Sequence, residues 1–574
     1  MIRKTLLAVL LTLCASGQAF AASLDQPLPL AGPRPDAATI QAWQDRKFGM
    51  FIHFGIFSVA GGMWNGKPID NGYSEQIFAN GNLPADQYAA LAKQFDPVNF
   101  DADAVAGLAQ AAGMKFIVIT AKHHDGFNMF KTGQTDYNVV DGTPYGKDIV
   151  KQLAAACARH GLAFGVYYSS IDWHHPGGNT YIEGNSNPIT PGQEAFNVAQ
   201  LKELLGNYGP ISEIWFDMGK PTPAQSARFA RTVHDLQPQT MVSGRVWNYQ
   251  GDFTVMGDNA EPGVAVEEPW QSPASMFPDT WGYRSWQVRD NLKGKIEEQI
   301  ARLVRVVSHG GNYILNIGPE GDGSVVPYEA DVLKGMGAWM KVNSQAVYAT
   351  QAQPFDALDF GYATVGKSTL YLFIDKRPAD GILRLPRLVD THLVSARLLG
   401  GEGTVLPVAT DAQGGTVDIS GVPAGGFMPV IAVTFDGGLH VRPDAVAAGS
   451  NGHVALTEKQ AAHFLNYNGE GYGAPDTLYK LRWYAAAPAG HYTVDIRYRP
   501  LARMTKLDLT IDGHRKTVRL PRAGHAVVRM DRDMTAEPYA MQVELTPVAP
   551  FHKGDILPVS VTGIDIAPVK GKVP

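Results

Sequence analysis

The chain is poor in cysteine. Only two of its 574 residues are cysteines, and Cys14 lies in an N-terminal segment that we expect to be removed, which leaves Cys157 alone. A single thiol excludes an intramolecular disulfide. The length is too great for one core, and a prior of about 150 residues per domain suggests two to four domains.

Long hydrophobic runs are also missing after the N-terminus. No stretch approaches the ~20 apolar residues that a membrane-spanning helix needs. The N-terminus has a positive pair at residues 3–4, an apolar run over 6–13 and a small-residue motif at 19–21. This layout is typical of a cleaved secretory signal, so residues 1–21 are excluded from the fold. We expect an exported protein, periplasmic or secreted. The residue before Cys14 is a poor match to a lipoprotein signal, which makes a lipid anchor the minor alternative.

The sequence has no long basic run, and its formal net charge is −6. Nucleic acid and anionic membranes are therefore not expected as partners. There is no Gly-rich phosphate loop and no serine in a nucleophile-elbow setting, so phosphoryl and acyl transfer are poorly supported. What the chain does have is 10 Trp, 22 Tyr and 61 Gly. Flat aromatic faces on Gly-rich loops suit the apolar faces of sugars.

Apolar runs alternate with helical patterns from residue 37 to 318. Alternation of this kind predicts a parallel sheet, and the count favours a (β/α)₈-like TIM barrel over an open doubly wound sheet. We assign residues 22–348 to this barrel, with a helix missing after the fifth strand. The strands are expected at 49–55, 115–120, 162–169, 211–217, 240–244, near Val264 and at 312–318.

The pattern changes near residue 350 to short alternating strands. Helical periodicity disappears, which predicts a β-sandwich over 349–443. A Gly/Ser/Asn break at 449–452 then introduces a second β-sandwich module, assigned to 444–574. That module is either a carbohydrate-binding domain or a structural support, because aromatic residues on strands serve a core at least as often as a ligand.

Polar and ionisable side chains fall at or just after successive strand ends. In a barrel the carboxyl ends of the strands meet on one face, where such enzymes keep their chemistry. Each residue alone has a simpler explanation: an aspartate caps the next helix, and an arginine neutralises it. Their joint occurrence predicts a site containing His53, Glu75, His123, His124, Tyr168, Asp217 and Arg245.

These residue types fit an uncharged polyol better than a metal. His53 has no second ligand one or two residues away, and the adjacent His123 and His124 would point in opposite directions on a strand. Neutral histidines and tryptophans bind and stack on hydroxylated rings. Glycoside hydrolysis needs two carboxyl groups, and Asp217 with a glutamate from the aromatic passage 247–283 would supply them. In the retaining version Asp217 is the nucleophile and the glutamate is the acid/base. No metal or cofactor is expected.

The motifs together resemble the α-L-fucosidases of glycoside hydrolase family 29. The resemblance covers roughly residues 40–345 and rests on several motifs in order: WQDRKFGMFIHFG (43–55), Ser74-Glu75, KHHDGF (122–127), 165–173, Trp215-Phe216-Asp217, 280–283 and GGNYILNIGP (310–319). It implies a (β/α)₈-like barrel followed by a β-sandwich, and an exo-acting, retaining, metal-independent enzyme that removes terminal fucose from a glycan or oligosaccharide.

The same resemblance implies roles for individual residues. Asp217 is the nucleophile, and Met218 replaces the glycine that usually follows it. The polar strand-end residues contact fucose hydroxyls, with Tyr167 as an alternative to Tyr168. The walls around the sugar ring and its methyl group are formed by Trp64, Trp215 and Trp281.

The acid/base is the main departure from the family pattern. Many relatives have a P-W-E segment, but this chain has Gln271 after Trp270, and a glutamine cannot donate a proton. Other branches take the acid from the preceding loop, which leaves Glu261, Glu267 and Glu268. We favour Glu261, because it lies mid-loop. Two alternatives remain open: a retaining glycosidase for another 6-deoxy or galacto-configured sugar, and a non-catalytic fucose-binding protein.

Overall fold

The computed structural model describes residues 32–176, 186–266, 268–401, 403, 405–411, 414–466, 477–487, 490–534, 540–548 and 557–569. The predicted signal segment, 1–21, lies outside these residues. Within them, no helix is long and apolar enough to cross a membrane.

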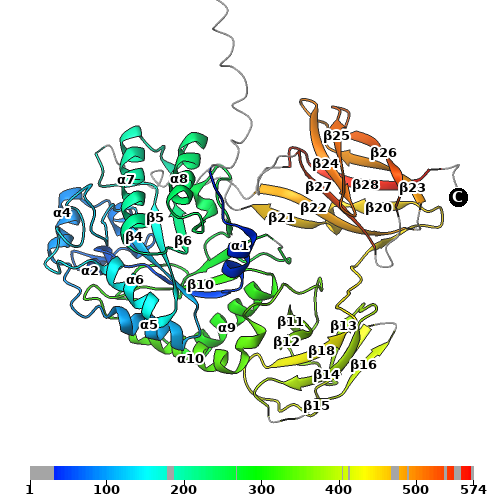
Figure 1. Cartoon of the computed structure of the whole chain (residues 1–574), viewed down its shortest axis with the longest axis horizontal. Helices are drawn as coiled ribbons and strands as arrows, with labels where there is room; N and C mark the ends of the chain where they lie inside the picture. Colours follow the sequence, from blue (N-terminus) through cyan, green and yellow to red (C-terminus); the bar gives the residue numbers. More distant parts are fainter. Residues whose placement is uncertain are drawn as a thin grey trace, which may run out of the picture.

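Eight parallel strands build the first domain (Figure 1). They are β1 (Phe48–Ile52), β4 (Phe116–Lys122), β5 (Ala163–Ser169), β6 (Glu213–Asp217), β7 (Met241–Val242), β8 (Thr254–Val255), β9 (Trp270–Ala274) and β10 (Asn312–Ile317). Their order is β7-β6-β5-β4-β1-β10-β9-β8. The two outer strands meet, because Asp252 N–H donates to the carbonyl of Val242 at 2.7 Å and Gly244 N–H donates to that of Phe253 at 2.8 Å. The predicted (β/α)₈-like barrel is confirmed.

Helices surround this barrel. The long ones are α1 (Ala37–Gln44), α5 (Ala102–Ala111), α6 (Ile149–His160), α7 (Pro191–Asn207), α8 (Pro223–Leu236), α9 (Leu292–Ser308) and α10 (Pro327–Asn343). Four consecutive ones, α5 to α8, begin after an Asp or Thr whose side chain accepts a first-turn N–H. Such N-caps stabilise a helix by about 1 kcal/mol each. The loop after β1 carries α2 (Phe57–Ala60), β2 (Met63–Trp64), β3 (Lys67–Pro68), α3 (Ile77–Asn80) and α4 (Ala85–Ala89).

The segment between β7 and β9 departs from the regular pattern. Among its described residues there is no α-helix, and the strand expected near Val264 is wrong. The chain forms β8 before that point and β9 after it. Strand β9 was hidden in the sequence because Gln271, Ser272 and Pro273 are neither apolar nor β-prone, although all three are buried.

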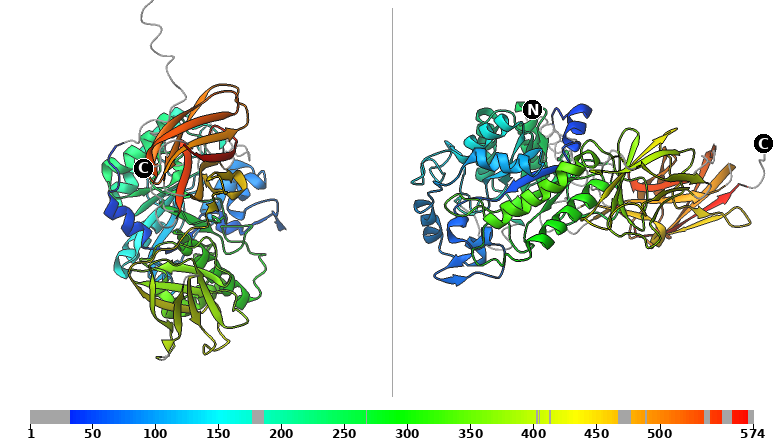
Figure 2. Two further views of the ribbon diagram at one scale, coloured as in Figure 1. Left: turned by 90° about the vertical axis from the view of Figure 1, so that its right-hand side faces the viewer. Right: turned by 90° about the horizontal axis from the view of Figure 1, so that it is seen from below.

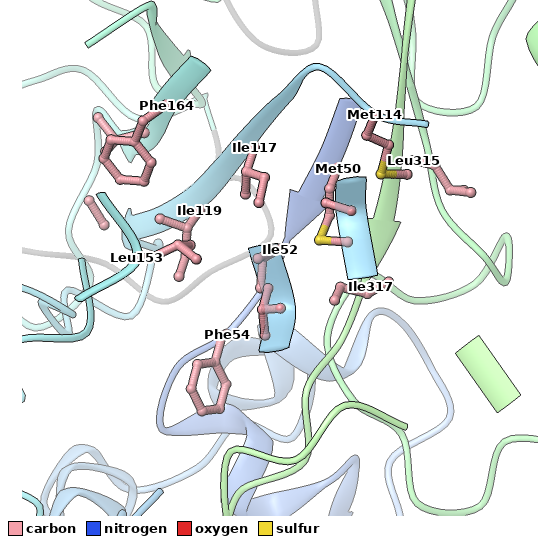
Figure 3. Packing of buried hydrophobic residues seen from close by; sticks show 14 of the residues in the cluster. Met50, Ile52, Phe54, Met114, Ile117, Ile119, Leu153, Phe164, Leu315 and Ile317 are labelled. Carbon is pink, nitrogen blue, oxygen red and sulfur yellow. The ribbon is translucent and has the colours of Figure 1, made fainter. Parts of the chain in front are cut away.

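Alternation along each strand separates two cores. On β6, Ile214 and Phe216 point outward, and Phe216 stacks on Phe229 of α8 with ring centroids 6.1 Å apart. Trp215 belongs instead to the aromatic core inside the barrel. Figure 3 shows the outer core, where side chains of β1, β4 and β10 pack beside Leu153 of α6. This two-residue period delivers Asp217 to the barrel interior.

The first β-sandwich has its own core. One sheet is ordered β11-β12-β18-β14-β15 and the other β13-β17-β16. The strands are β11 (Gly361–Val365), β12 (Thr369–Ile374), β13 (Ile382–Pro386), β14 (His392–Leu398), β15 (Val405–Leu406), β16 (Val408–Asp411), β17 (Gly414–Asp418) and β18 (Val430–Asp436).

A second sandwich follows, again with a separate core. Its sheets are β19-β22-β27-β24-β25, with β21 on β22, and β20-β28-β23-β26. Both sandwiches lie on the same side of the barrel (Figures 1 and 2). The predicted all-β C-terminal region is therefore confirmed. The strands are β19 (Val446–Ala447), β20 (Val454–Thr457), β21 (Ala462–Asn466), β22 (Thr477–Ala486), β23 (Gly490–Tyr498), β24 (Thr505–Ile511), β25 (His514–Leu520), β26 (His525–Met534), β27 (Met541–Pro547) and β28 (Val561–Pro568).

Candidate active site

A narrow pocket opens at the carboxyl ends of the barrel strands. It brings together most of the residues that the sequence placed at strand ends, although they span more than 200 positions of the chain. Its lining is Phe51, His53, Tyr73, Glu75, Gln76, His123, His124, Tyr167, Trp215, Asp217, Met218, Arg245, Asp258 and Trp281.

Asp217 lies at the end of β6 and is 6% exposed. Its Oδ2 accepts the Tyr167 hydroxyl at 2.7 Å, and its Oδ1 accepts Arg245 Nη1 at 2.9 Å. The next residue, Met218, has φ 62°, so the chain turns sharply away once the carboxylate is placed. A buried carboxylate held by two donors is fixed in position.

A second carboxylate lies on the other side of the same arginine. Asp258 Oδ1 accepts Arg245 Nη2 at 2.6 Å, and 31% of its side chain is exposed. Asp258 was not among the residues proposed from the sequence. Its signal was its place in the aromatic passage 247–283, but the family pattern directed attention to glutamates. The guanidinium of Arg245 also lies 5.0 Å from the ring centroid of Trp215, which fixes the plane of the bridge.

His53 presents one defined tautomer to the pocket. Its Nδ1 lies 2.6 Å from Asn316 Oδ1, and the amide orientation is set because Asn316 Nδ2 donates to the carbonyl of Trp281 at 2.6 Å. The histidine must therefore donate through Nδ1, which leaves Nε2 as an acceptor. Burial lowers the pKa of His53 to about 4, so the ring is neutral near pH 7.

His123 and His124 follow β4 and are both neutral. Burial holds the pKa of each well below its usual value, and the neighbouring histidines add to the effect. The Ser169 hydroxyl donates to the carbonyl of Ile171 at 2.9 Å, so it accepts from His124 Nδ1 at 2.8 Å. The His123 and His124 ring centroids are 3.8 Å apart. Contrary to the expectation for a strand, both side chains reach the pocket, because β4 ends before them.

Glu75 holds the far wall of the pocket. Its Oε2 accepts the backbone N–H groups of Trp281 and Gly282 at 3.0 and 2.8 Å. The side chain is 1% exposed, and burial raises the pKa of Glu75 to about 7. This carboxyl therefore positions the loop that carries Trp281, one of the predicted walls.

The predicted tryptophan walls are only partly correct. Trp215 and Trp281 line the pocket, whereas Trp64, on the hairpin of β2 and β3, is absent from its lining. Trp215 Nε1 donates to Gln271 Oε1 at 2.7 Å, and Gln271 Nε2 reaches Glu213 Oε1 at 3.2 Å. Gln271 is fully buried beneath the pocket and orients Trp215, which gives it a structural role.

The structure places the glutamates proposed as acid/base elsewhere. Glu261 pairs with two arginines of α9: its Oε1 is 3.1 Å from Arg302 Nε and its Oε2 is 2.6 Å from Arg305 Nε. Glu268 faces the second sandwich, 3.3 Å from the Tyr479 hydroxyl. Glu267 lies outside the described residues. Neither Glu261 nor Glu268 lines the pocket, so the preference for Glu261 is wrong in its geometry.

Tyr168 is likewise replaced by its neighbour. Its hydroxyl lies 2.9 Å from Asn197 Oδ1 and 2.8 Å from Gln200 Oε1, both on α7. Successive strand residues point to opposite faces, so only one of the two tyrosines can reach the barrel interior. The hydrogen bond to Asp217 identifies that residue as Tyr167, the alternative that the sequence left open.

Within the described part of the chain, no group of three His, Cys, Asp or Glu side chains is arranged to hold a metal ion. The expectation that no metal is needed stays a prediction.

Comparison with known proteins identifies relatives for most of the chain. The family model for alpha-L-fucosidases matches residues 33–345, more than half of the sequence. The tissue alpha-L-fucosidase of Mus musculus is 30% identical over 414 residues, covering 68% of this chain and 89% of that protein. The plasma alpha-L-fucosidase of Pongo abelii is 34% identical over 379 residues, covering 61% and 79%.

Solved structures extend the similarity beyond the barrel. The alpha-L-fucosidase from Vibrio sp. strain EJY3 is 25% identical, with a TM-score of 0.65, and covers 93% of this chain and 98% of its own. A family 29 alpha-L-fucosidase from Bacteroides thetaiotaomicron is 27% identical, with a TM-score of 0.64, covering 71% and 99%. That structure is described as a trapped covalent intermediate with 2-fluoro-fucosyl fluoride.

Proposed function

Because the chain belongs to the α-L-fucosidase family and is a glycoside hydrolase, we propose that it removes terminal α-L-fucose from glycans or oligosaccharides with retention of configuration. The observation that carries the mechanism is the bridge Asp217–Arg245–Asp258, which puts two carboxyl groups in one pocket. We also propose that the protein is exported, on the basis of its N-terminal segment.

In the first step, a carboxylate oxygen of Asp217 attacks the anomeric carbon of fucose. The bond from that carbon to the aglycone oxygen breaks, and Asp258 transfers its proton to the leaving oxygen. The product is a covalent fucosyl ester on Asp217. The Bacteroides relative trapped as a covalent intermediate supports this step. Two donors, from Tyr167 and Arg245, hold the attacking carboxylate in place.

In the second step, the Asp258 carboxylate removes a proton from water. The water oxygen attacks the anomeric carbon, the ester bond to Asp217 breaks, and fucose leaves with its original anomeric configuration. Retaining enzymes need carboxyl groups about 5–5.5 Å apart. A single guanidinium that binds both aspartates is compatible with a close separation of this kind.

Two carboxyl groups compete for the acid/base role. Burial raises the pKa of Glu75 to about 7, which suits a general acid, but two backbone N–H groups immobilise its Oε2 and the side chain is nearly inaccessible. Asp258 is partly exposed at the rim, where an aglycone leaves and water enters. Asp258 must detach from Arg245 before it donates a proton in the first step, because the guanidinium contacts its Oδ1. We assign the role to Asp258.

The neutral histidines suit hydroxyl recognition. His53 offers an acceptor at Nε2, and His123 Nδ1 is buried without a partner among the described residues. A neutral ring both donates and accepts, which matches the hydroxyl groups of an uncharged sugar. The rings of Tyr167 and His123 stack with their centroids 5.6 Å apart, which limits the orientation of the His123 ring.

Side-by-side assays of nitrophenyl α-L-fucoside and nitrophenyl galactosides test the substrate. We expect turnover of the fucoside. Hydrolysis of a galactoside alone would contradict the proposal and support the related-sugar alternative. Full activity after EDTA treatment is expected, and a loss restored by a metal ion would contradict the metal-free mechanism.

Replacement of the nucleophile tests the chemistry. Asp217→Ala should lower kcat by about 10⁴-fold or more, since no other carboxylate reaches the same position. Azide should partly restore turnover by replacing the missing nucleophile. A pure binding protein would show fucose binding by calorimetry, no turnover, and no azide effect.

A further inference from the structure

A second cavity lies at the opposite end of the barrel. It is a cleft of about 500 Å³ between the barrel and both sandwiches. The barrel contributes α1, the turn before β1 and the segments before β9 and β10, and the second sandwich contributes β21 and β22 (Figure 1). This volume lies within the range of small-ligand sites, about 300–1,000 Å³.

The cleft is separate from the catalytic pocket. Lys47 lines the cleft and His53 lines the pocket, at opposite ends of β1. Six residues of extended chain at ~3.3 Å each separate the two by roughly 20 Å. One sugar residue cannot contact both, so the cleft does not hold the sugar residue that lies in the catalytic pocket.

Lys47 is the least satisfied charged group of this cleft. It is 3% exposed, and its Nζ donates to the carbonyl of Gly310 at 3.4 Å. Within the described residues, no carboxylate oxygen lies within 4.0 Å of this ammonium group. Burial lowers the pKa of Lys47 to about 8, and the nearby Asp45 carboxylate partly offsets this effect. A buried ammonium with unused donors is costly unless an anion binds it.

Lys47 also has an unusual backbone. Its φ is 56°, in a region that non-glycine residues other than Asn and Asp rarely adopt. Strain of this kind persists where the surrounding structure imposes it, often at ligand sites.

The rest of the lining suits a sugar. Gln44 and Gln351 offer amide donors and acceptors, and the half-buried Tyr484 contributes aromatic surface. The neighbouring Phe464 is buried, and Lys480 of the same sheet covers its ring with Nζ 4.2 Å from the ring centroid. Amides and aromatic faces are the usual partners of hydroxyl groups and sugar rings.

The charge of the second sandwich favours an anion. Residues 444–574 contain 16 Lys and Arg against 13 Asp and Glu, whereas the whole chain has a net charge of −6. One carboxylate, Asp356, lines the cleft, but it is exposed and its Oδ2 lies 3.7 Å from Arg387. The second sandwich therefore has a net positive charge, opposite in sign to that of the whole chain.

We propose that this cleft is a second, non-catalytic carbohydrate site that binds an acidic sugar, with Lys47 receiving its carboxylate or sulfate group. Tyr484 contributes the wall against the sugar ring. Such a site anchors an acidic polysaccharide and raises the local concentration of its other branches at the barrel. The proposal does not depend on which sugar the barrel hydrolyses.

Calorimetry with the full-length protein tests the ligand class. Trigalacturonic acid should bind, and its methyl ester, which has the same rings without charge, should bind at least about tenfold more weakly. Inorganic sulfate should compete with the acid trimer. Equal binding of the ester, or no binding of the trimer at millimolar concentration, would overturn the proposal.

A matched pair of lysine variants tests the site. Lys47→Met keeps an unbranched side chain that is one atom shorter, and it should weaken trimer binding at least about tenfold, with fucoside hydrolysis unchanged and Tm equal or higher. The control Lys341→Met removes an exposed charge from α10 and should leave binding unchanged. Equal losses in both variants would indicate non-specific attraction and contradict the assignment.

A second variant covers the case in which Lys47→Met is unstable. Gln351→Glu keeps both backbone hydrogen bonds to Val365 and places a negative charge in the cleft. Trimer binding should fall several-fold, while Gln351→Ala should have a smaller effect. Unchanged binding in Gln351→Glu, or tighter binding of duplex DNA than of the trimer, would overturn the acidic-sugar assignment.

Discussion

Two carboxylates three residues apart have different surroundings in this molecule. Asp258 binds Arg245 inside the pocket, whereas Glu261 binds Arg302 and Arg305 on the outside of the barrel. The residue between them that reverses the chain is Asn259, with φ 59°. Position within a loop therefore does not assign a catalytic role. The role of each carboxylate depends on the arginine that it binds.

Asn259 is itself held firmly. Its N–H donates to the carbonyl of Pro273 at 3.0 Å, and its Oδ1 accepts Ser275 N–H at 2.9 Å and Arg302 Nη1 at 3.2 Å. The loop is therefore attached to β9 and α9 on one side of Asn259. Asp258, on the other side, remains at the pocket rim.

The largest expected effect separates Asp258 from Glu261 in catalysis. Asp258→Ala should lower kcat/KM by about 10²–10⁴-fold on a natural fucoside, because the poor leaving group needs a proton. Activity on an activated nitrophenyl fucoside should fall much less. Glu261→Ala should stay within a few-fold of wild type on both substrates. The reverse order of the two variants would restore Glu261 as the acid.

A smaller effect should distinguish the adjacent tyrosines. Tyr167→Phe removes a hydrogen bond to Asp217 and should lower kcat by about 10-fold or more, since hydrogen bonds to charged groups contribute about 1.5–3 kcal/mol. Tyr168→Phe should leave kcat unchanged, because its hydroxyl contacts only α7. Kinetics of both variants on one fucoside make this measurement, and equal losses would contradict the placement of the two side chains.

For stability, we expect the opposite order, with a larger loss on replacing Glu261 than on replacing Asp258. Glu261→Gln leaves two arginines without a charged partner, and we expect a loss of about 1–3 kcal/mol in the free energy of unfolding, reduced from the buried-pair value by partial exposure. Asp258→Asn should cost less, because Arg245 keeps Asp217. Urea unfolding compares the two. A more stable Glu261→Gln protein would show that this ion pair contributes nothing.

The smallest expected effect concerns pH. Burial raises the pKa of Glu75 to about 7 from its usual value near 4.5, so the folded state binds a proton that the unfolded state releases. This contribution to stability is fully present below about pH 4.5 and is lost as pH rises through 7. Glu75→Gln should therefore flatten the fall in Tm between pH 5 and 8. An unchanged slope would show that Glu75 does not titrate in this window.

Sequence patterns alone predict the barrel, the all-β C-terminal region and most of the pocket. Apolar residues that recur every 2 or every 3.6 positions indicate which face of a strand or helix is buried. In a barrel, the carboxyl ends of all the strands meet on the same face. For that reason Asp217, His53 and Arg245 were identifiable at distant positions. The family motifs then indicated the kind of sugar.

Which of two residues close together in the sequence lies in the pocket depends on tertiary contacts. Tyr167 and Tyr168 are both β-prone, and which one faces inward depends on the register of β5 against β6, where Tyr167 aligns with Trp215. The positions of the loop carboxylates Asp258 and Glu261 depend on the turn at Asn259. The position of Glu261 also depends on two arginines of α9 that lie more than 40 residues away in the sequence. The cleft around Lys47 depended on how the second sandwich packs against the barrel. Each of these outcomes depends on contacts between distant segments, which local patterns do not encode.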